Sequence, residues 1–229
     1  QRINEGAAAC MLSHAVSTDL DNLAANLNTE RLITTPETAT ADAEMESDTA
    51  LRLRAQSAFE GLSVAGPTGA YEYFAKSVSG KVADARATSP SPAVVIVSVL
   101  STEGDGTASA ELLSSVRNAL NDENIRPVGD RLTVQSAAII DYQIRAQLYF
   151  YPGPESEPIL TAAQNALQSW LTQQGKIGRD VARSAIMAAL HVQGVQRVEL
   201  QEPVSDLVID DTQSARCTSF AISKGGTDE

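Results

Sequence analysis

The sequence has few of the residues on which enzymes and metalloproteins most often depend. Its 229 residues include only two histidines, His14 and His191, and two cysteines, Cys10 and Cys217. Two histidines leave little scope for a histidine-dependent nucleophile or a multi-histidine metal site. Each lies on an expected helix, and we interpret both as packed or surface residues. The cysteines lie at opposite ends of the chain with no Cys or His at metal-ligand spacing, which indicates reduced thiols in a cytosolic product.

Basic residues and long apolar runs are also scarce. The chain carries 17 Lys and Arg against 29 Asp and Glu, a net charge of -12, and the acidic excess is spread along its length. No segment is basic enough to neutralise phosphates, so we expect no nucleic-acid partner. No run of about 18 apolar residues occurs, nor a cationic leader followed by an apolar stretch, so neither membrane insertion nor secretion by a signal peptide is indicated.

The clearest pattern that is present is an alternation of apolar and polar residues from Ile140 to Phe150. A period of two predicts a strand with one buried face and one exposed face. The apolar run at 134–139 predicts that this strand begins earlier and is unusually long, and hence that it belongs to a sizeable sheet.

Residues 1–60 predict a helical N-terminal region with a loop at 34–46. Helical spacing indicates helices over Arg2–His14, from Thr18 as the capping residue, and from Ser47 or Asp48. The stretch Thr34–Glu44 is rich in Thr, Ala and acidic residues, which is typical of a linker or surface loop. We expect the apolar stripe of the second helix to be partly exposed or covered by a second copy; its members are Leu20, Leu23 and Leu27.

The rest of the chain predicts two small α+β modules, 61–134 and 135–229. The first combines a helix capped by Thr68, strands at 82–88 and 93–100, and a helix around 112–120. The second combines the long strand, helices at 156–171 and 180–191, and strands at 195–200 and 215–222. The predicted fold class is therefore α+β, with a helical N-terminal region and mostly antiparallel or mixed sheets.

Two loops have residues that could bind ions. The loop Gly66–Gly69 precedes an expected helix, whose first backbone N–H groups could hold an anion, but it lacks the Lys of a phosphate loop and a preceding strand. The loop Thr102–Gly106 offers oxygen ligands, but it lacks the acidic residues at alternate positions and the terminal Glu of a calcium-binding loop. We favour turn structures for both, the second being a hairpin or a strand-to-helix turn.

Two carboxylate pairs complete the candidates for chemistry. They are Asp210 with Asp211, and Glu155 with Glu157, all in expected turns. Neither pair has a neighbouring group suited to general acid–base catalysis, so we interpret both as solvated. We predict no catalytic, cofactor-binding or metal-binding residue.

Several segments spread over essentially the whole chain form a recognisable series in their order and spacing. They are Glu46-Ser47-Asp48, Leu51–Arg54, Phe59–Glu72, Ser89–Ala93, Arg126-Pro127-Val128 with Asp130-Arg131, Tyr149–Pro154 and Gly194–Val198. In these segments the chain resembles the baseplate J-like proteins of contractile phage tails. The resemblance implies a structural, non-enzymatic wedge protein of a phage or prophage baseplate, assembled in the host cytoplasm and retained in the virion. Its implied partners are other wedge and hub proteins and further copies of itself, and its implied role includes passing on the signal for sheath contraction. The alternative from the residues alone is a small enzyme or anion-binding module that uses the Gly66–Gly69 loop.

Overall fold

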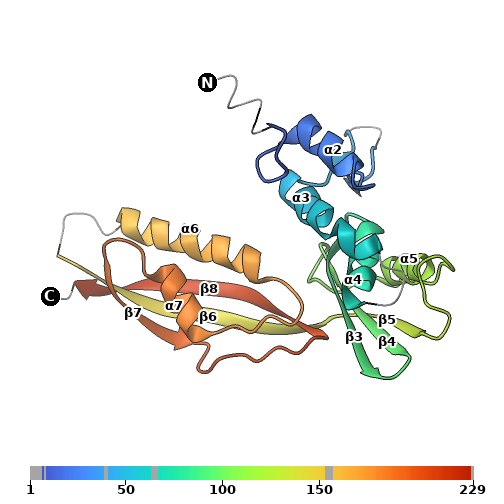
Figure 1. Cartoon of the computed structure of the whole chain (residues 1–229). Helices are drawn as coiled ribbons and strands as arrows, with labels where there is room; N and C mark the ends of the chain where they lie inside the picture. The colour runs from blue at the N-terminus through green and yellow to red at the C-terminus, as the bar shows by residue number, and fades with distance from the viewer. Residues whose placement is uncertain (1–6, 8, 39–40, 63–66, 153–156, 228–229) are drawn as a thin grey trace. The chain divides into compact units, whose positions relative to one another are not determined.

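The computed structural model describes residues 7, 9–38, 41–62, 67–152 and 157–227 of the chain. The chain divides into two compact units, Gln1–Ser136 and Ala137–Glu229 (Figure 1). Both units combine helices with small sheets, which confirms the predicted α+β class.

Two helices open the first unit, α2 (Ser17–Ala25) and α3 (Asp48–Ser57). Their contact buries Leu20 and Ala24 of α2 against Leu51 of α3, all at 0% exposure. The expectation that the apolar stripe of α2 is partly exposed or covered by a second copy is therefore wrong for Leu20, because α3 of the same chain covers it. Its other two members are partly buried.

The sequence predicts the start of α3 correctly but not the start of α2. Ser47 caps α3 by accepting a hydrogen bond from the Ala50 N–H, as predicted. Thr18 does not cap α2, which begins one residue earlier, and the Ser17 N–H instead donates to Asp48 Oδ2 at 2.9 Å. Of the helix predicted over Arg2–His14, residues 2–6 and 8 lie outside the described residues, and 10–14 form turns and a bend.

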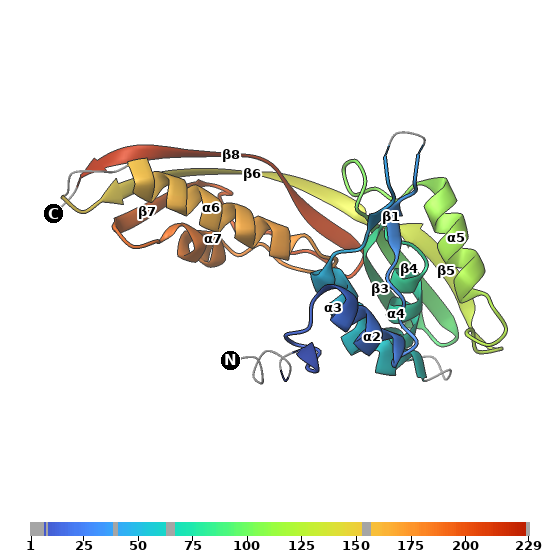
Figure 2. The same cartoon turned by 90° about the horizontal axis from the view of Figure 1, so that it is seen from above.

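The stretch predicted as a loop at 34–46 forms a short antiparallel hairpin of β1 (Ile33–Thr35) and β2 (Glu44–Met45), which runs away from α2 and α3 in Figure 2. Its base is fixed by a buried ion pair, in which Arg54 Nη2 lies 2.7 Å from Glu46 Oε2. The backbone of Glu46 also donates to the carbonyl of Leu32. The pairing was missed because its strands are short and their side chains mostly exposed.

The first unit continues with η1 (Ala58–Leu62), α4 (Thr68–Ser77), β3 (Val82–Ser91), β4 (Val94–Ser101), α5 (Ala110–Leu120) and β5 (Arg131–Ser136). The sheet order is β3-β4-β5, with β3 antiparallel and β5 parallel to β4. Tyr71 of α4 and Val116 of α5 pack with Val97 and Val99 of β4 in one core. The central place of β4 explains its nearly continuous apolar sequence, since both of its edges are paired and its side chains are largely buried.

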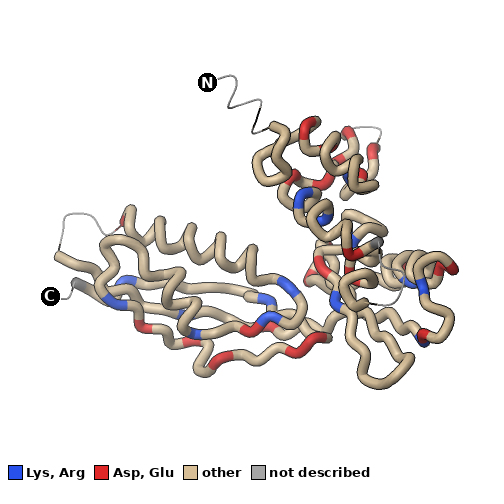
Figure 3. Tube along the Cα trace, in the orientation of Figure 1, with Lys and Arg blue, Asp and Glu red and all other residues tan. Residues whose placement is uncertain are grey.

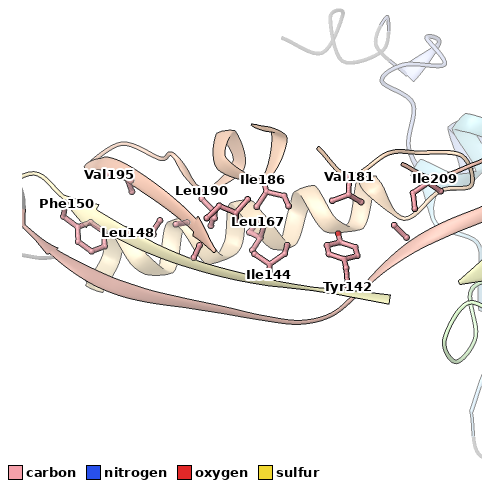
Figure 4. Close-up of a cluster of buried hydrophobic side chains, with 14 residues drawn as sticks. Tyr142, Ile144, Leu148, Phe150, Leu167, Val181, Ile186, Leu190, Val195 and Ile209 are labelled. Carbon is pink, nitrogen blue, oxygen red and sulfur yellow. The ribbon is translucent and has the colours of Figure 1, made fainter. Parts of the chain in front are cut away.

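The long strand predicted across 134–150 is divided between the two units. Val134 lies in β5 and pairs with Val97, whereas β6 starts at Ala138 and ends at Phe150. The predicted alternation in β6 is confirmed: five inward-facing residues are at most 7% exposed, namely Tyr142, Ile144, Ala146, Leu148 and Phe150 (Figure 4).

The second unit places β6 between β7 (Val195–Glu202), which is antiparallel to it, and β8 (Gln213–Thr227), which is parallel. The sheet is therefore mixed, as predicted. Helices α6 (Glu157–Gln174) and α7 (Arg183–Leu190) contribute Leu167, Ile186 and Leu190 to the core over the inward face of β6 (Figure 4).

Candidate interaction surfaces

The residues best suited to catalysis are not gathered into one place. His14 is exposed in a turn, where Nδ1 lies 2.8 Å from the Ser13 hydroxyl, and His191 is exposed at the end of α7. The prediction that both histidines lie on helices is therefore wrong, since His14 lies in a turn and His191 lies one residue beyond the end of α7. Cys10 and Cys217 are free thiols in different units, and burial raises the pKa of Cys217 above that of an ordinary thiol.

The loop Gly66–Gly69 is described only from Pro67 onward, so Gly66 lies outside the described residues. Pro67 is the N-cap of α4 and Thr68 its first residue, so the predicted capping by Thr68 is wrong. Glu60 Oε2 lies 2.7 Å from the position that a Cβ at Gly69 would occupy. A carboxylate of the chain itself therefore occupies the space beside this helix terminus, which disfavours a second anion there.

The loop Thr102–Gly106 connects β4 to α5, which is one of the two forms that we expected, a hairpin or a strand-to-helix turn. The Ser101 N–H donates to the carbonyl of Gly106, and Glu103 pairs with Lys81 at 2.9 Å. Gly104 and Gly106 have positive φ angles of 61° and 96°, which glycine adopts readily. These contacts give the loop a structural role.

The carboxylate pairs serve as turn and surface residues. Asp210 Oδ1 accepts hydrogen bonds from the N–H and hydroxyl of Thr212, and these bonds lower the pKa of Asp210. Glu155 lies outside the described residues, and Glu157 pairs with Lys224 at 2.6 Å. Within the described ranges, no group of three or more His, Cys, Asp or Glu residues could hold a metal ion. None of the helices described is long and apolar enough to cross a bilayer.

The outward face of the second unit's sheet is a polar surface on which opposite charges are paired. Acidic and basic residues are interspersed over these strands in Figure 3. Arg216 binds both carboxylate oxygens of Asp141, at 2.8 and 2.9 Å. Such exposed pairs contribute at most about 1 kcal/mol each to stability. Because opposite charges are paired on this face, it has no strong electrostatic field of one sign.

A groove runs beside β8 on the opposite, helix-covered face. It has a volume of about 480 Å³ and lies between the end of α6 and the middle of β8. Its apolar lining comes from Tyr142, Leu171, Ala215, Cys217 and Phe220. Its polar and charged lining comes from Gln168, Thr172, Gln174, Arg216, Thr218 and Ser219, together with Gly175. Phe220 remains 36% exposed there.

We did not predict this groove from the sequence. The available signal was the uncharged run Cys217–Ser223 between Arg216 and Lys224. That run predicts a strand, but it does not show that the strand lies at a sheet edge with an uncovered aromatic side chain.

Comparison with known proteins identifies the family of the chain. Across 233 aligned residues that include the whole chain, it is 57% identical to "Baseplate protein J" of Escherichia phage P2, of which it covers 77%. Three family models also match: the baseplate J-like N-terminal domain at 1–38, the central domain at 63–136 and the C-terminal domain at 142–223. The chain belongs to the baseplate J-like family.

One solved structure that contains a similar chain is the cryo-EM structure of the anti-feeding prophage baseplate, 6-fold symmetrised. The match has 17% sequence identity and a TM-score of 0.48, and it covers 80% of the present chain. The present chain spans 43% of that chain.

Proposed function

We propose that this protein is a structural wedge component of the baseplate of a contractile phage or prophage tail. The observation that carries the proposal is the 57% identity, over the full chain, to a protein named as a baseplate protein. The protein would assemble in the host cytoplasm and remain in the tail of the virion.

In this role the protein acts through contacts with other baseplate proteins and without catalysis. Its proposed partners are wedge and hub proteins and further copies of itself, and these contacts help pass on the signal for sheath contraction. Assembly of this kind depends on shape, buried anchors and charge complementarity spread over a surface. The dispersed histidines and the internally bonded carboxylates are consistent with such a role. We further propose that 1–60, 61–134 and 135–229 act as three modules.

The alternative of an anion-binding module or small enzyme at Gly66–Gly69 is less well supported. The Glu60 carboxylate beside Gly69 repels an anion at the start of α4. No observation on the described residues favours that alternative.

Gene deletion and complementation test the proposal. The gene is removed from the phage or prophage that carries it, and the wild-type protein is supplied from a plasmid. We expect particles with contractile tails to disappear on deletion and to return on complementation, with the protein present in purified tails. Normal yields of infectious particles after deletion, or tails that lack the protein, would contradict a structural role.

A further inference from the structure

The hairpin of β1 and β2 (Figure 2) is held in place by the rest of the first unit. At its base, the buried carboxylate of Glu46 pairs with Arg54 and also accepts a hydrogen bond from the Leu32 N–H at 3.2 Å. Beside it, Thr34 packs against Gly80, where an added Cβ would lie 2.7 Å from Thr34 Cγ2. The hairpin is therefore ordered before any partner binds, which lowers the entropic cost of docking.

The hairpin exposes a pair of apolar side chains. Ile33 and Met45 are register partners across the two strands, so their side chains lie on the same face. They are 53% and 49% exposed, respectively. The described residues thus leave about half of each side chain in contact with water, and a partner that covers the pair gains from its burial.

The hairpin is also acidic. No Lys or Arg occurs between Arg31 and Arg52. Three exposed carboxylates lie on the hairpin, namely Glu37, Asp42 and Glu44. In the described parts of the chain none of the three belongs to an ion pair, and Glu44 accepts a hydrogen bond from the neutral Thr35 hydroxyl. Uncompensated negative charge beside an apolar pair favours a partner surface that is basic.

The chain itself does not provide such a basic surface. It carries 17 basic against 29 acidic residues. Of the Lys and Arg side chains that the structure describes, all but two take part in an ion pair or a hydrogen bond within the chain. The two exceptions, Arg131 and Lys176, lie in different units. A second copy would therefore meet the hairpin mainly with like charge, which disfavours it as the occupant.

We propose that the β1–β2 hairpin docks on a different baseplate protein, whose contact surface presents Lys or Arg side chains around an apolar patch. Ile33 and Met45 contact the apolar patch, while the three carboxylates pair with the basic groups. The apolar contact contributes burial, and the charges speed association and fix the orientation of the partner. This inference rests on the proposed baseplate function and assigns one surface to it.

Photo-cross-linking in assembled tails identifies the occupant. Benzoylphenylalanine is placed at Met45, or at the exposed Thr35 if the first variant is absent from tails, and purified tails are irradiated and analysed by mass spectrometry. We expect cross-links to a different baseplate protein, at a segment that contains Lys or Arg. Cross-links only to a second copy or to a segment without basic residues, or no cross-link in tails that contain the protein, would overturn the inference and leave the baseplate function intact.

Matched charge variants test the role of the carboxylates. The test variant neutralises the three on the hairpin: Glu37→Gln, Asp42→Asn and Glu44→Gln. The control neutralises three exposed carboxylates elsewhere in the first unit: Asp19→Asn, Glu111→Gln and Glu123→Gln. We expect the test variant to lower the yield of infectious particles at least about tenfold, the loss that about 1.4 kcal/mol of binding would produce, and the control to assemble normally. Equal yields from the two variants would refute the charge pairing.

A second pair of variants tests the apolar contact. Ile33→Thr removes apolar surface but keeps a β-branched residue that suits a strand, and it should lower the yield at least about fivefold. Val128→Thr is the control, because Val128 is 99% exposed in the same unit and lies outside the hairpin. Circular dichroism and the urea midpoint establish that both variants fold. Full yield from folded Ile33→Thr, or equal losses from both variants, would refute the apolar contact.

Discussion

Replacing Ile144 by Asp should unfold the second unit selectively. Ile144 is 1% exposed and lies on β6 in the core that α6 and α7 cover. Removing a buried Ile side chain costs about 2–5 kcal/mol, and burying a carboxylate without a partner adds several kcal/mol more. The sum is comparable with the whole stability of a domain, about 5–15 kcal/mol.

The chain carries its own probe for this experiment. Its single tryptophan, Trp170, is partly buried against the core of the second unit. Urea titration followed by tryptophan emission therefore reports on this unit. We expect Ile144→Asp to show the emission of an exposed tryptophan even without urea, while part of the helical circular dichroism from the first unit remains.

Gln143→Thr is the matched control on the same strand. Gln143 is the neighbouring residue and faces solvent on the opposite side of the sheet. Threonine suits an exposed strand position, so the unfolding midpoint should change by less than about 0.5 kcal/mol in free energy. Equal midpoints for Ile144→Asp and Gln143→Thr would show that the buried face of β6 is wrongly assigned.

Three further predictions concern the first unit and the histidines. Arg54→Ala leaves the buried Glu46 carboxylate without its partner and should destabilise the first unit by about 3–5 kcal/mol, measured by urea unfolding followed by circular dichroism; a loss below about 1 kcal/mol would mean that the pair is solvated. Hydrogen bonds from the Ser17 N–H and from Arg31 hold the pKa of Asp48 below its usual 3.8. Stability from this group is therefore present above the unfolded pKa and is lost as pH falls through the lower folded pKa. Thermal midpoints below about pH 4 should fall less steeply for Asp48→Asn than for wild type, and identical slopes would argue against the contact. His14→Ala and His191→Ala should support normal tail assembly in complementation, and loss of infectivity from a variant that folds and assembles would revive a catalytic role.

The parts of the fold that sequence predicts well are those in which local preference and burial agree. In β6 the alternation predicts both strand geometry and the buried face, and the structure has both. The cap at Ser47 is also local, since its hydroxyl binds an N–H three residues away. The start of α2 depends instead on Asp48, 31 residues from Ser17. No local rule identifies a partner at that distance.

The surfaces were harder to predict for the same reason. The hairpin of β1 and β2 depends on the contact between Arg54 and Glu46, which becomes apparent only once α3 is in place. The groove beside Phe220 depends on strand order and on where α6 ends. Sequence pattern indicates which residues favour a strand, but whether that strand lies at the edge is decided by the other strands of the sheet.

The position of β8 also constrains how the protein is made. The contact between Asp141 and Arg216 joins residues 75 apart in the sequence, so β6 must wait for much of the second unit to be synthesised before β8 can pair with it. Such non-local pairing slows folding and prolongs the exposure of unpaired strands. The first unit can begin to fold earlier on the ribosome, because all of its residues, 1–136, are synthesised before those of the second unit. A ribosome that stalls before residue 213 would therefore hold a finished first unit followed by a sheet whose central strand still has one open side.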